Sequence, residues 1–269
     1  MQNKLAISNL AWTGNHDATL AQLSTLGVDG VEVAPGKVTG GCDTLDMGAM
    51  KHYRTLCENH GLSIPSFQAF LFGKPHLQLL GEPNAFDQLI EHMHFVAELA
   101  AVAGARILVF GAPKNRLLMG RAIDEAQSLL IERLAILAEL CEANGVSIGL
   151  EAVPPIYGGE IITSYKDSLR IVETVDSPGL VLHLDAGCTY LNGDDISEAI
   201  ATCNDQIKHF HISQPQLADF GTPASYHQPA SERLHKINYS QWLCIEMLET
   251  KSPMDDIKQA VHLAQSIYG

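Results

Sequence analysis

Short apolar runs recur along the chain, and a longer segment with helical spacing separates each run from the next. In the segments at 86–104 and 126–145, apolar residues return every three or four positions, which is the period of an amphipathic helix. The short runs are rich in Val, Ile and Leu, as is typical of buried strands. We therefore predict eight strands, at residues 5–10, 30–34, 62–67, 105–110, 146–151, 180–185, 207–212 and 242–247.

Glycine residues mark the ends of four predicted helices. They stand just before predicted strands, at Gly27, Gly61, Gly104 and Gly145. Glycine reaches the left-handed backbone conformation without steric cost and is therefore common at helix C-termini. The repeated order of helix, glycine and strand indicates one supersecondary unit that recurs along the chain.

Eight strands that alternate with helices favour a closed (β/α)8 TIM barrel, formed as a single domain by residues 1–269. The length fits, because such barrels commonly have about 250 residues. A doubly wound parallel sheet is the alternative. The Gly-x-Gly-x-x-Gly fingerprint of dinucleotide-binding sheets does not follow the first predicted strand. No linker or low-complexity stretch marks a second domain.

The composition is that of an acidic globular protein. Its 31 acidic and 17 basic residues give a formal net charge of −14 at pH 7, which would repel a nucleic acid backbone. No window approaches the roughly 18 uninterrupted apolar residues of a membrane helix, and no secretory signal pattern opens the chain. The six cysteines form no CxxC pair, so we expect reduced thiols. We expect a soluble cytoplasmic protein that binds neither nucleic acid nor membranes.

The predicted strand ends carry the candidate chemistry, because functional residues of such barrels lie at the C-terminal ends of the strands. Strands five to eight end at or beside Glu151, Asp185, His211 and Glu246. Singly, each residue could equally be a loop or core group. Together, three carboxylates at one mouth repel each other unless a cation or shared protons neutralise them. We predict that these four residues bind one divalent metal ion per chain, with Mn2+ as first choice and Mg2+, Co2+ or Zn2+ as alternatives.

Other residues near the strand ends are candidates for substrate contact. Gln68 could donate a hydrogen bond, and Arg116 could clamp an anionic group of the substrate. Glu32 could face the substrate or form an ion pair with Lys37 or Arg116 at the rim. His227 lies in a long Pro- and Gly-rich stretch after strand seven, which could fold over the site as a lid or be a surface excursion.

Two further histidines lie one step deeper along the same strands. His183 and His209 stand two residues before Asp185 and His211, so strand alternation points them to the same side, deeper in the barrel. They could be metal ligands, contact the substrate, or belong to the core that supports the ligands. We include His183 among the candidates for the substrate pocket.

Five strings of the sequence carry a family resemblance: VFGAPKNR at 109–116, GLEAVP at 149–154, LHLDAGC at 182–188, HFHISQP at 209–215 and IEM at 245–247. In this order and spacing they resemble the xylose isomerase-like TIM barrels of sugar isomerases and epimerases, including ketose 3-epimerases and hydroxypyruvate isomerases. The resemblance implies that Glu151, Asp185, His211 and Glu246 bind the metal. It also implies that Glu151 and Glu246 exchange protons with a substrate carbon.

Two departures from the family pattern indicate a distinct substrate. The family's epimerases often carry a histidine three residues after the sixth-strand aspartate, where it contacts substrate oxygens; this chain has Cys188 there. After His211 the family often continues with acidic residues, whereas this chain has Ser213, Gln214 and Pro215. The pocket near strand seven is therefore less charged than is usual in the family.

These observations favour a metal-dependent isomerase or epimerase of a small sugar, sugar derivative or keto-polyol. A glutamate would remove a proton beside a carbonyl to give an enediolate. A metal-dependent dehydratase of an inositol- or shikimate-type ketone, with His227 as its acid, is the nearest alternative. A sugar-binding protein with a relict site is another. A hydrolase of abasic DNA is disfavoured by the net charge. The sequence leaves open whether the chain forms homo-oligomers.

Overall fold

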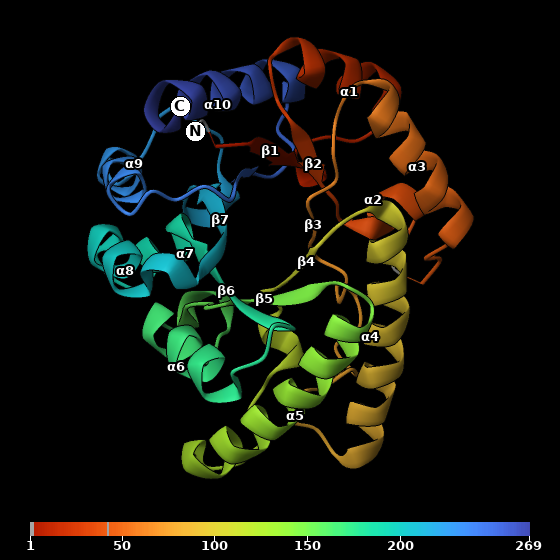
Figure 1. The fold of residues 1–269 in the computed structure, drawn as a ribbon, viewed down its shortest axis with the longest axis vertical. Coiled ribbons are helices and arrows are strands. Elements are labelled where there is room, and N and C mark those ends of the chain that lie inside the picture. Colours follow the sequence, from red (N-terminus) through yellow and green to blue (C-terminus); the bar gives the residue numbers. More distant parts are fainter. Residues whose placement is uncertain (1–2, 42) are drawn as a thin grey trace.

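The predicted apolar runs form eight parallel strands in the computed structural model, which describes residues 3–41 and 43–269 (Figure 1). Helical structure follows each strand, so the two element types alternate from β1 to α10. All eight strand predictions are confirmed, with bounds that are in most cases shorter. The strands are β1 Leu5–Ser8, β2 Gly30–Glu32, β3 Ser66–Phe67, β4 Ile107–Phe110, β5 Ser147–Glu151, β6 Leu180–Asp185, β7 Ile207–Ser213 and β8 Trp242–Glu246.

The strands close into a barrel. Backbone pairing joins them in the order β2-β1-β8-β7-β6-β5-β4-β3. The remaining seam, between β2 and the segment around β3, is joined by two isolated parallel bridges, from Gly30 to Ser63 and from Val33 to Phe67. The predicted (β/α)8 barrel is therefore confirmed, and an open doubly wound sheet is excluded.

The third strand is shorter than its apolar run predicts. Of residues 62–67, only Ser66–Phe67 form a strand. Pro65 has no N–H to donate to a ladder, although its carbonyl accepts from the N–H of Arg106 at 2.9 Å. The seam between β2 and β3 is consequently held by isolated bridges in place of a continuous ladder.

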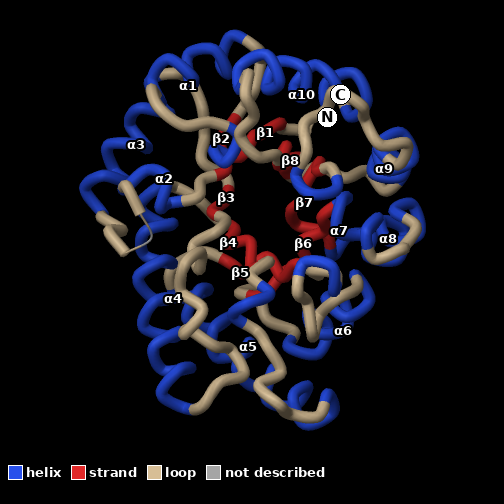
Figure 2. The backbone as a smooth tube through the Cα atoms, turned by 180° about the vertical axis from the view of Figure 1, so that it is seen from behind, coloured by secondary structure: helices blue, strands red, loops and turns tan. Residues whose placement is uncertain are grey.

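Helices form a layer around the ring of strands (Figure 2). Their apolar faces are buried at helical spacing, as with Leu89, Met93 and Val96 of α4. The helices cover the sides of the barrel, and the loops that follow the strands lie at the C-terminal ends of the strands. The helices are α1 His16–Thr25, α2 Pro35–Thr39, α3 Met47–Asn59, α4 Pro83–Ala103, α5 Ile123–Ala143, α6 Tyr165–Val175, α7 Ala186–Leu191, α8 Ile196–Cys203, α9 His227–Lys236 and α10 Pro253–Tyr268.

Left-handed glycines follow four of the helices, as predicted. Gly27, Gly61, Gly104 and Gly145 have φ angles of 77°, 72°, 89° and 69°. Gly104 directly follows α4, and its N–H bonds the carbonyls of the last helical turn. The left-handed residue ends each helix and lets the chain turn back toward the next strand.

Strand alternation makes the interior of the barrel polar near its mouth. In β6, Leu182 and Leu184 point to the helix layer, whereas His183 and Asp185 point to the interior. The ring of His183 lies against the ring of His211 on β7, with centroids 4.2 Å apart. Polar residues of successive strands therefore meet inside the barrel.

The thiols of the described residues are unpaired, as expected. Cys57, Cys141, Cys188, Cys203 and Cys244 are free, and all but Cys188 are fully buried. Cys42 lies outside the described residues. No helix in the ranges 3–41 and 43–269 combines the length and apolarity that a membrane span requires.

Candidate active site

Strands β5 to β8 bring the four predicted metal ligands to one face of the barrel. Glu151, Asp185 and Glu246 end their strands, and His211 lies two residues before the end of β7. The strands are staggered, as a closed barrel requires: Asp185 is level with His211, whereas Glu151 is level with His183. The stagger explains why the ligands do not share one backbone register although they meet at one mouth.

The imidazole of His211 is the centre of this group. Its Nδ1 lies 3.2 Å from Oε2 of Glu246 and 3.6 Å from Oδ2 of Asp185. Its Nε2 lies 3.0 Å from Oε1 of Glu32. Because the ring is 1% exposed, three carboxylates surround a buried imidazole, two on the Nδ1 side and one on the Nε2 side.

Glu151 completes the group on the side of β5. Glu151, Asp185 and Cys188 each offer a donor atom within 4.8 Å of the others, and Asp185 belongs to a second such group with His183 and His211. The Sγ of Cys188 lies 3.6 Å from Oε1 of Glu151. Asp185 therefore links Glu151 to His211, and His211 in turn contacts Glu246. Among the described residues, no group with all donor atoms within 4.8 Å of one another contains all four predicted ligands.

Burial and like charge shift the acid strengths of these residues. Burial raises the pKa of Glu151 to about 8, and the charges of Asp185 and Glu246 add to the rise. Burial likewise raises the pKa of Glu246. Burial opposes the charge of His211, but the surrounding carboxylates outweigh it and raise its pKa well above the ordinary range. Burial also opposes the charge of Asp185, yet its hydrogen bonds and the nearby imidazole lower its pKa.

This donor set fits a divalent cation. Carboxylate oxygens and an imidazole nitrogen suit Mn2+, Mg2+, Co2+ and Zn2+. A histidine that binds a metal usually donates its other N–H to a carboxylate or carbonyl, and Glu32 occupies that place beside His211 Nε2. Burial and the charges of Asp185 and Glu246 raise the pKa of Glu151 although His211 and Arg116 oppose the rise, so a bound cation would relieve the repulsion that remains. The residues that could hold the cation are Glu151, Asp185, His211 and Glu246.

The carboxylate of Glu151 occupies space that a glycine leaves open. Gly111 directly follows β4, and a Cβ at this position would lie 1.7 Å from Oε2 of Glu151. Any other residue at 111 would therefore displace the carboxylate. Because Gly111 of VFGAPKNR has no Cβ, it leaves room for the Glu151 carboxylate.

Arg116 does not lie free in the mouth, as a clamp for a substrate anion would. Its side chain is 1% exposed. Nη1 donates to the carbonyl of Phe110 at 3.2 Å, and Nη2 donates to the carbonyl of Glu151 at 2.8 Å. Burial lowers the pKa of Arg116 to about 10, which still leaves it charged at neutral pH. The predicted clamp is corrected: this guanidinium joins the ends of β4 and β5.

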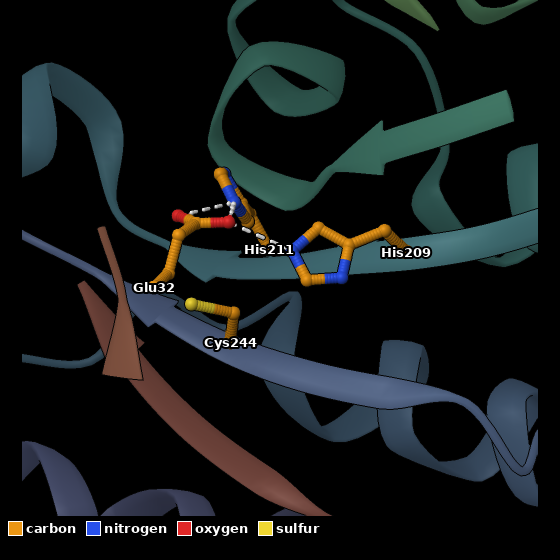
Figure 3. A group of neighbouring side chains, drawn as sticks. All are labelled: Glu32, His209, His211 and Cys244. Atoms are coloured by element: carbon orange, nitrogen blue, oxygen red, sulfur yellow. Dashed lines mark hydrogen bonds and ion pairs between the residues drawn. The ribbon is translucent and has the colours of Figure 1, made fainter. Parts of the chain in front are cut away.

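Glu32 and Gln68 are both buried and lie side by side inside the barrel. Figure 3 shows Glu32 beside His209 and His211. Glu32 has no exposed surface and contacts His211, so the predicted rim ion pair with Lys37 or Arg116 is wrong. Strand alternation turns the side chain of Glu32 into the barrel interior. Gln68 donates from Nε2 to Oε1 of Glu32 at 2.8 Å. In this structure both residues support the site from within.

His183 and His209 lie deeper than the predicted ligands, as strand alternation predicts. His209 Nε2 lies 2.8 Å from Oε2 of Glu32. The His183 ring packs against the rings of His209 and His211, and its nitrogens have no hydrogen-bond partner within the part of the chain that is described. Burial lowers the pKa of His183 and of His209, which favours neutral rings.

His227 belongs to the helix layer. It is the first residue of α9 and not part of the preceding connection. Its ring is fully buried, Nδ1 lies 2.8 Å from the hydroxyl of Tyr268, and Phe220 and Tyr226 pack against it. Burial lowers its pKa to about 4. The predicted substrate-binding role of His227 is therefore corrected, because its ring packs between α9 and α10.

Residues that support the acids were not recognised as such from the sequence. Ser213 donates from Oγ to Oδ2 of Asp185 at 2.6 Å, and Ser66 donates to Oε2 of Glu32 at 2.7 Å. Each serine lies near the end of a strand, two residues from a predicted site residue. A search for hydroxyl groups at strand ends, in addition to acids and imidazoles, could have found both. No sequence signal identifies Gly111, because its role depends on the direction of another side chain.

Comparisons with known proteins identify the family of this chain. The family model described as xylose isomerase-like TIM barrel matches residues 20–267. The chain is 24% identical over 189 residues to fructoselysine 3-epimerase of Escherichia coli O157:H7, covering 70% of this chain and 68% of that protein. The fructoselysine 3-epimerase of Shigella flexneri matches with the same identity and covers 67% of its length.

Solved structures of sugar epimerases share the fold. The 3-keto-D-glucoside 4-epimerase of E. coli superposes with a TM-score of 0.81 at 15% identity, covering 98% of this chain and all of that one. A D-psicose 3-epimerase has a TM-score of 0.82 at 13% identity and covers 99% of both chains. An L-ribulose 3-epimerase has a TM-score of 0.80 at 18% identity and covers 99% of this chain and 95% of the other.

The close approach between Gly111 and Glu151 gives a first prediction. Gly111→Ala should lower the free energy of unfolding by about 1–3 kcal/mol, because the added methyl group overpacks the carboxylate. In a Glu151→Ala background the same substitution should cost less than about 0.5 kcal/mol, since the clashing group is gone. Urea unfolding of the four proteins in EDTA measures this coupling. An equal cost in both backgrounds would mean that Gly111 serves another purpose.

The raised pKa of Glu151 gives a second prediction, for the metal-free protein. Between pH 5 and pH 8 the folded state holds a proton on Glu151 that the unfolded state releases, so stability falls as the pH rises. Glu151→Gln removes this penalty and should raise the free energy of unfolding by about 1–2 kcal/mol at pH 8, with little effect at pH 5. The exposed Glu173→Gln is the control. Glu151→Gln less stable than wild type at pH 8 would contradict the assignment.

Proposed function

Since the chain belongs to the xylose isomerase-like TIM barrel family, we propose that it is a metal-dependent epimerase or isomerase of a small sugar or sugar derivative. One observation carries the proposal. Of the four predicted ligands, Glu151 and Glu246 are the most exposed, each at 9%, compared with 4% for Asp185 and 1% for His211. Two glutamates at the opening, above a more deeply buried aspartate and histidine, are placed to meet a substrate as well as a metal.

The proposed ligands of the metal are Glu151, Asp185, His211 through Nδ1, and Glu246, with Mn2+ as first choice. When bound, a divalent cation supplies positive charge to the two adjacent substrate oxygens that become negative in an enediolate. The protein's own contribution is orientation. Asp185 accepts from Ser213 Oγ and from the N–H of Cys188, so its carboxylate is fixed before any ligand arrives.

Proton transfer is assigned to the two glutamates. Glu151 ends β5 and Glu246 ends β8, with β6 and β7 between them, so they approach the opening from different sides. One ionised glutamate removes the proton from the carbon beside the carbonyl, and the other, already protonated, returns a proton to its opposite face. The centre is thereby inverted. In the metal-free protein, burial raises the pKa of both glutamates, so each holds a proton more readily than a free carboxyl group does.

Epimerisation is favoured over dehydration by the position of His227. A dehydratase needs an acid that protonates the departing hydroxyl, and the residue considered for that role is buried in the helix layer beside Tyr268. The proteins that this chain resembles are also epimerases, of fructoselysine and of ketoses. A sugar-binding protein with a relict site is disfavoured by the presence of both glutamates.

The charge of the mouth favours a substrate without a phosphate group. Arg116 is the cation beside Glu151, and its guanidinium is buried and bonded to two backbone carbonyls. A phosphate close to Asp185, Glu151 and Glu246 would meet like charge that the bound cation offsets only in part. We therefore place the substrate among unphosphorylated sugars and neutral sugar derivatives.

Solvent exchange tests the proposed function. Mn2+-loaded protein incubated in D2O with D-fructose, D-psicose, D-tagatose, L-ribulose or fructoselysine should give an epimer or isomer that carries deuterium beside the carbonyl, detected by NMR. Glu151→Gln and Glu246→Gln should abolish turnover even with excess Mn2+, because each removes a proton-transfer group. Asp185→Asn should chiefly weaken the binding of Mn2+, and excess metal should restore turnover.

Several results would overturn this proposal. A wild-type protein that binds none of the four cations, by elemental analysis and by calorimetry, has no metal site of this kind. Turnover that retains the substrate hydrogen completely would indicate a hydride shift and not proton transfer. Product formed with loss of water would identify a dehydratase.

Discrimination against phosphate is a separate prediction. The value of kcat/KM for the preferred free sugar should exceed that for its terminal phosphate ester by at least about tenfold, since like-charge contact costs several kcal/mol. Steady-state kinetics on the two compounds at 0.15 M salt measures the ratio. Equal or better use of the phosphate ester would mean that a cation outside the described contacts recognises it.

A further inference from the structure

The carboxylate of Glu32 collects four hydrogen-bond donors inside the barrel. Oε2 accepts from Ser66 Oγ at 2.7 Å and is 2.8 Å from His209 Nε2. Oε1 accepts from Gln68 Nε2 at 2.8 Å. His211 Nε2 faces both oxygens, with a hydrogen bond to Oε2 at 3.1 Å and a distance of 3.0 Å to Oε1. A carboxylate with no exposed surface requires such donors, because an unpaired buried charge costs several kcal/mol.

The acceptor role of Glu32 fixes what the two histidines do. An ionised carboxylate offers only acceptor sites, so His209 and His211 must each present an N–H at Nε2. A neutral imidazole carries one N–H, and its other nitrogen is then an acceptor. For His211 that other nitrogen is Nδ1, the atom that faces Asp185 and Glu246.

We propose that Glu32 is a positioning residue that orients the His211 ring and keeps the lone pair of Nδ1 directed at the metal. This inference rests on the proposed metal site. Figure 3 shows the arrangement, with both imidazoles directed at the Glu32 carboxylate. Glu32 reaches His211 from the opposite part of the chain: it ends β2, 179 residues away in sequence from its partner on β7.

The same cluster does not call for a metal of its own. Glu32, His209, His211 and Cys244 have donor atoms within 4.8 Å of one another, which resembles a ligand set. The hydrogen bonds already satisfy both oxygens of Glu32, and a cation there would have to displace N–H groups from His209 and His211. The Cys244 thiol is directed at the carbonyl of Ile245, at 3.7 Å. With one cation bound at Nδ1 of His211 and Glu32 accepting from Nε2, each nitrogen of the ring has one partner.

The test measures metal binding separately from activity. Glu32→Gln keeps the size of the side chain but offers an amide N–H2 where His211 needs an acceptor, so it should weaken Mn2+ binding by about 10–100-fold in calorimetry. Cys244→Ala is the matched control, because it disturbs the same buried cluster without touching a hydrogen bond to His211. It should keep Mn2+ affinity within about threefold of wild type and a stoichiometry of one.

The outcomes separate the two proposals. A wild-type protein without Mn2+ affinity would refute the metal site itself. Wild-type affinity that persists in Glu32→Gln would overturn the positioning role, while equal losses in Glu32→Gln and Cys244→Ala would reduce it to packing. A stoichiometry that falls in Cys244→Ala would instead place a metal in the cluster.

A measurement on the wild type avoids dependence on the folding of the variant. Histidine 15N spectra of the protein loaded with diamagnetic Zn2+ distinguish a protonated nitrogen from a metal-bound one. We expect His211 to show a protonated Nε2 and a metal-bound Nδ1. A metal-bound Nε2 with a protonated Nδ1 would overturn the proposal without any substitution.

Discussion

Three carboxylates surround one buried imidazole and a fourth lies beside them, and the cost of that negative charge determines how the mouth of the barrel is built. Glu32, Asp185 and Glu246 lie within 3.0–3.6 Å of the His211 nitrogens, and a carboxylate oxygen of Glu151 lies within 4.8 Å of one of Asp185. Buried like charges either take up protons, find hydrogen-bond donors or bind a cation. In this structure, different carboxylates are accommodated in different ways. Glu32 and Asp185 have donors that lower their pKa values, whereas burial and like charge raise those of Glu151 and Glu246.

This division matches the roles that we propose, with Glu32 and Asp185 as supporting residues and Glu151 and Glu246 as the groups that transfer protons. The well-bonded acids are the more deeply buried, and the two with raised pKa values are at the opening. A group that moves protons near neutral pH needs a pKa close to neutrality, whereas a group that orients a ligand needs fixed bonds. A barrel can hold both kinds of residue, because every second side chain of a strand points to the interior. Successive inward side chains of one strand therefore lie at different depths below the mouth.

The sequence predicted the barrel and the four proposed ligands because both depend on local rules. Apolar runs, capping glycines and the position of polar residues at strand ends can all be read along one strand. Contacts across the barrel could not be predicted in this way. The partner of Glu32 was sought at the rim, with Lys37 or Arg116, but it is His211 on the far side of the interior. The errors for Arg116 and His227 have the same origin, since burial depends on packing that no single segment specifies.

The role of Glu32 also bears on the closure of the barrel. The seam between β2 and β3 is joined by isolated bridges, since Pro65 interrupts the third strand. Two of the donors to Glu32, Ser66 and Gln68, lie just across this seam, and the N–H of Gln68 bonds the carbonyl of Val33 at 2.9 Å. The side chain of Glu32 therefore adds bonds where the backbone ladder is incomplete. The other two donors come from β7, which carries His211. One buried carboxylate thus links the weakest seam of the barrel to the orientation of the proposed metal ligand, so a change that loosens the seam should also disturb the site.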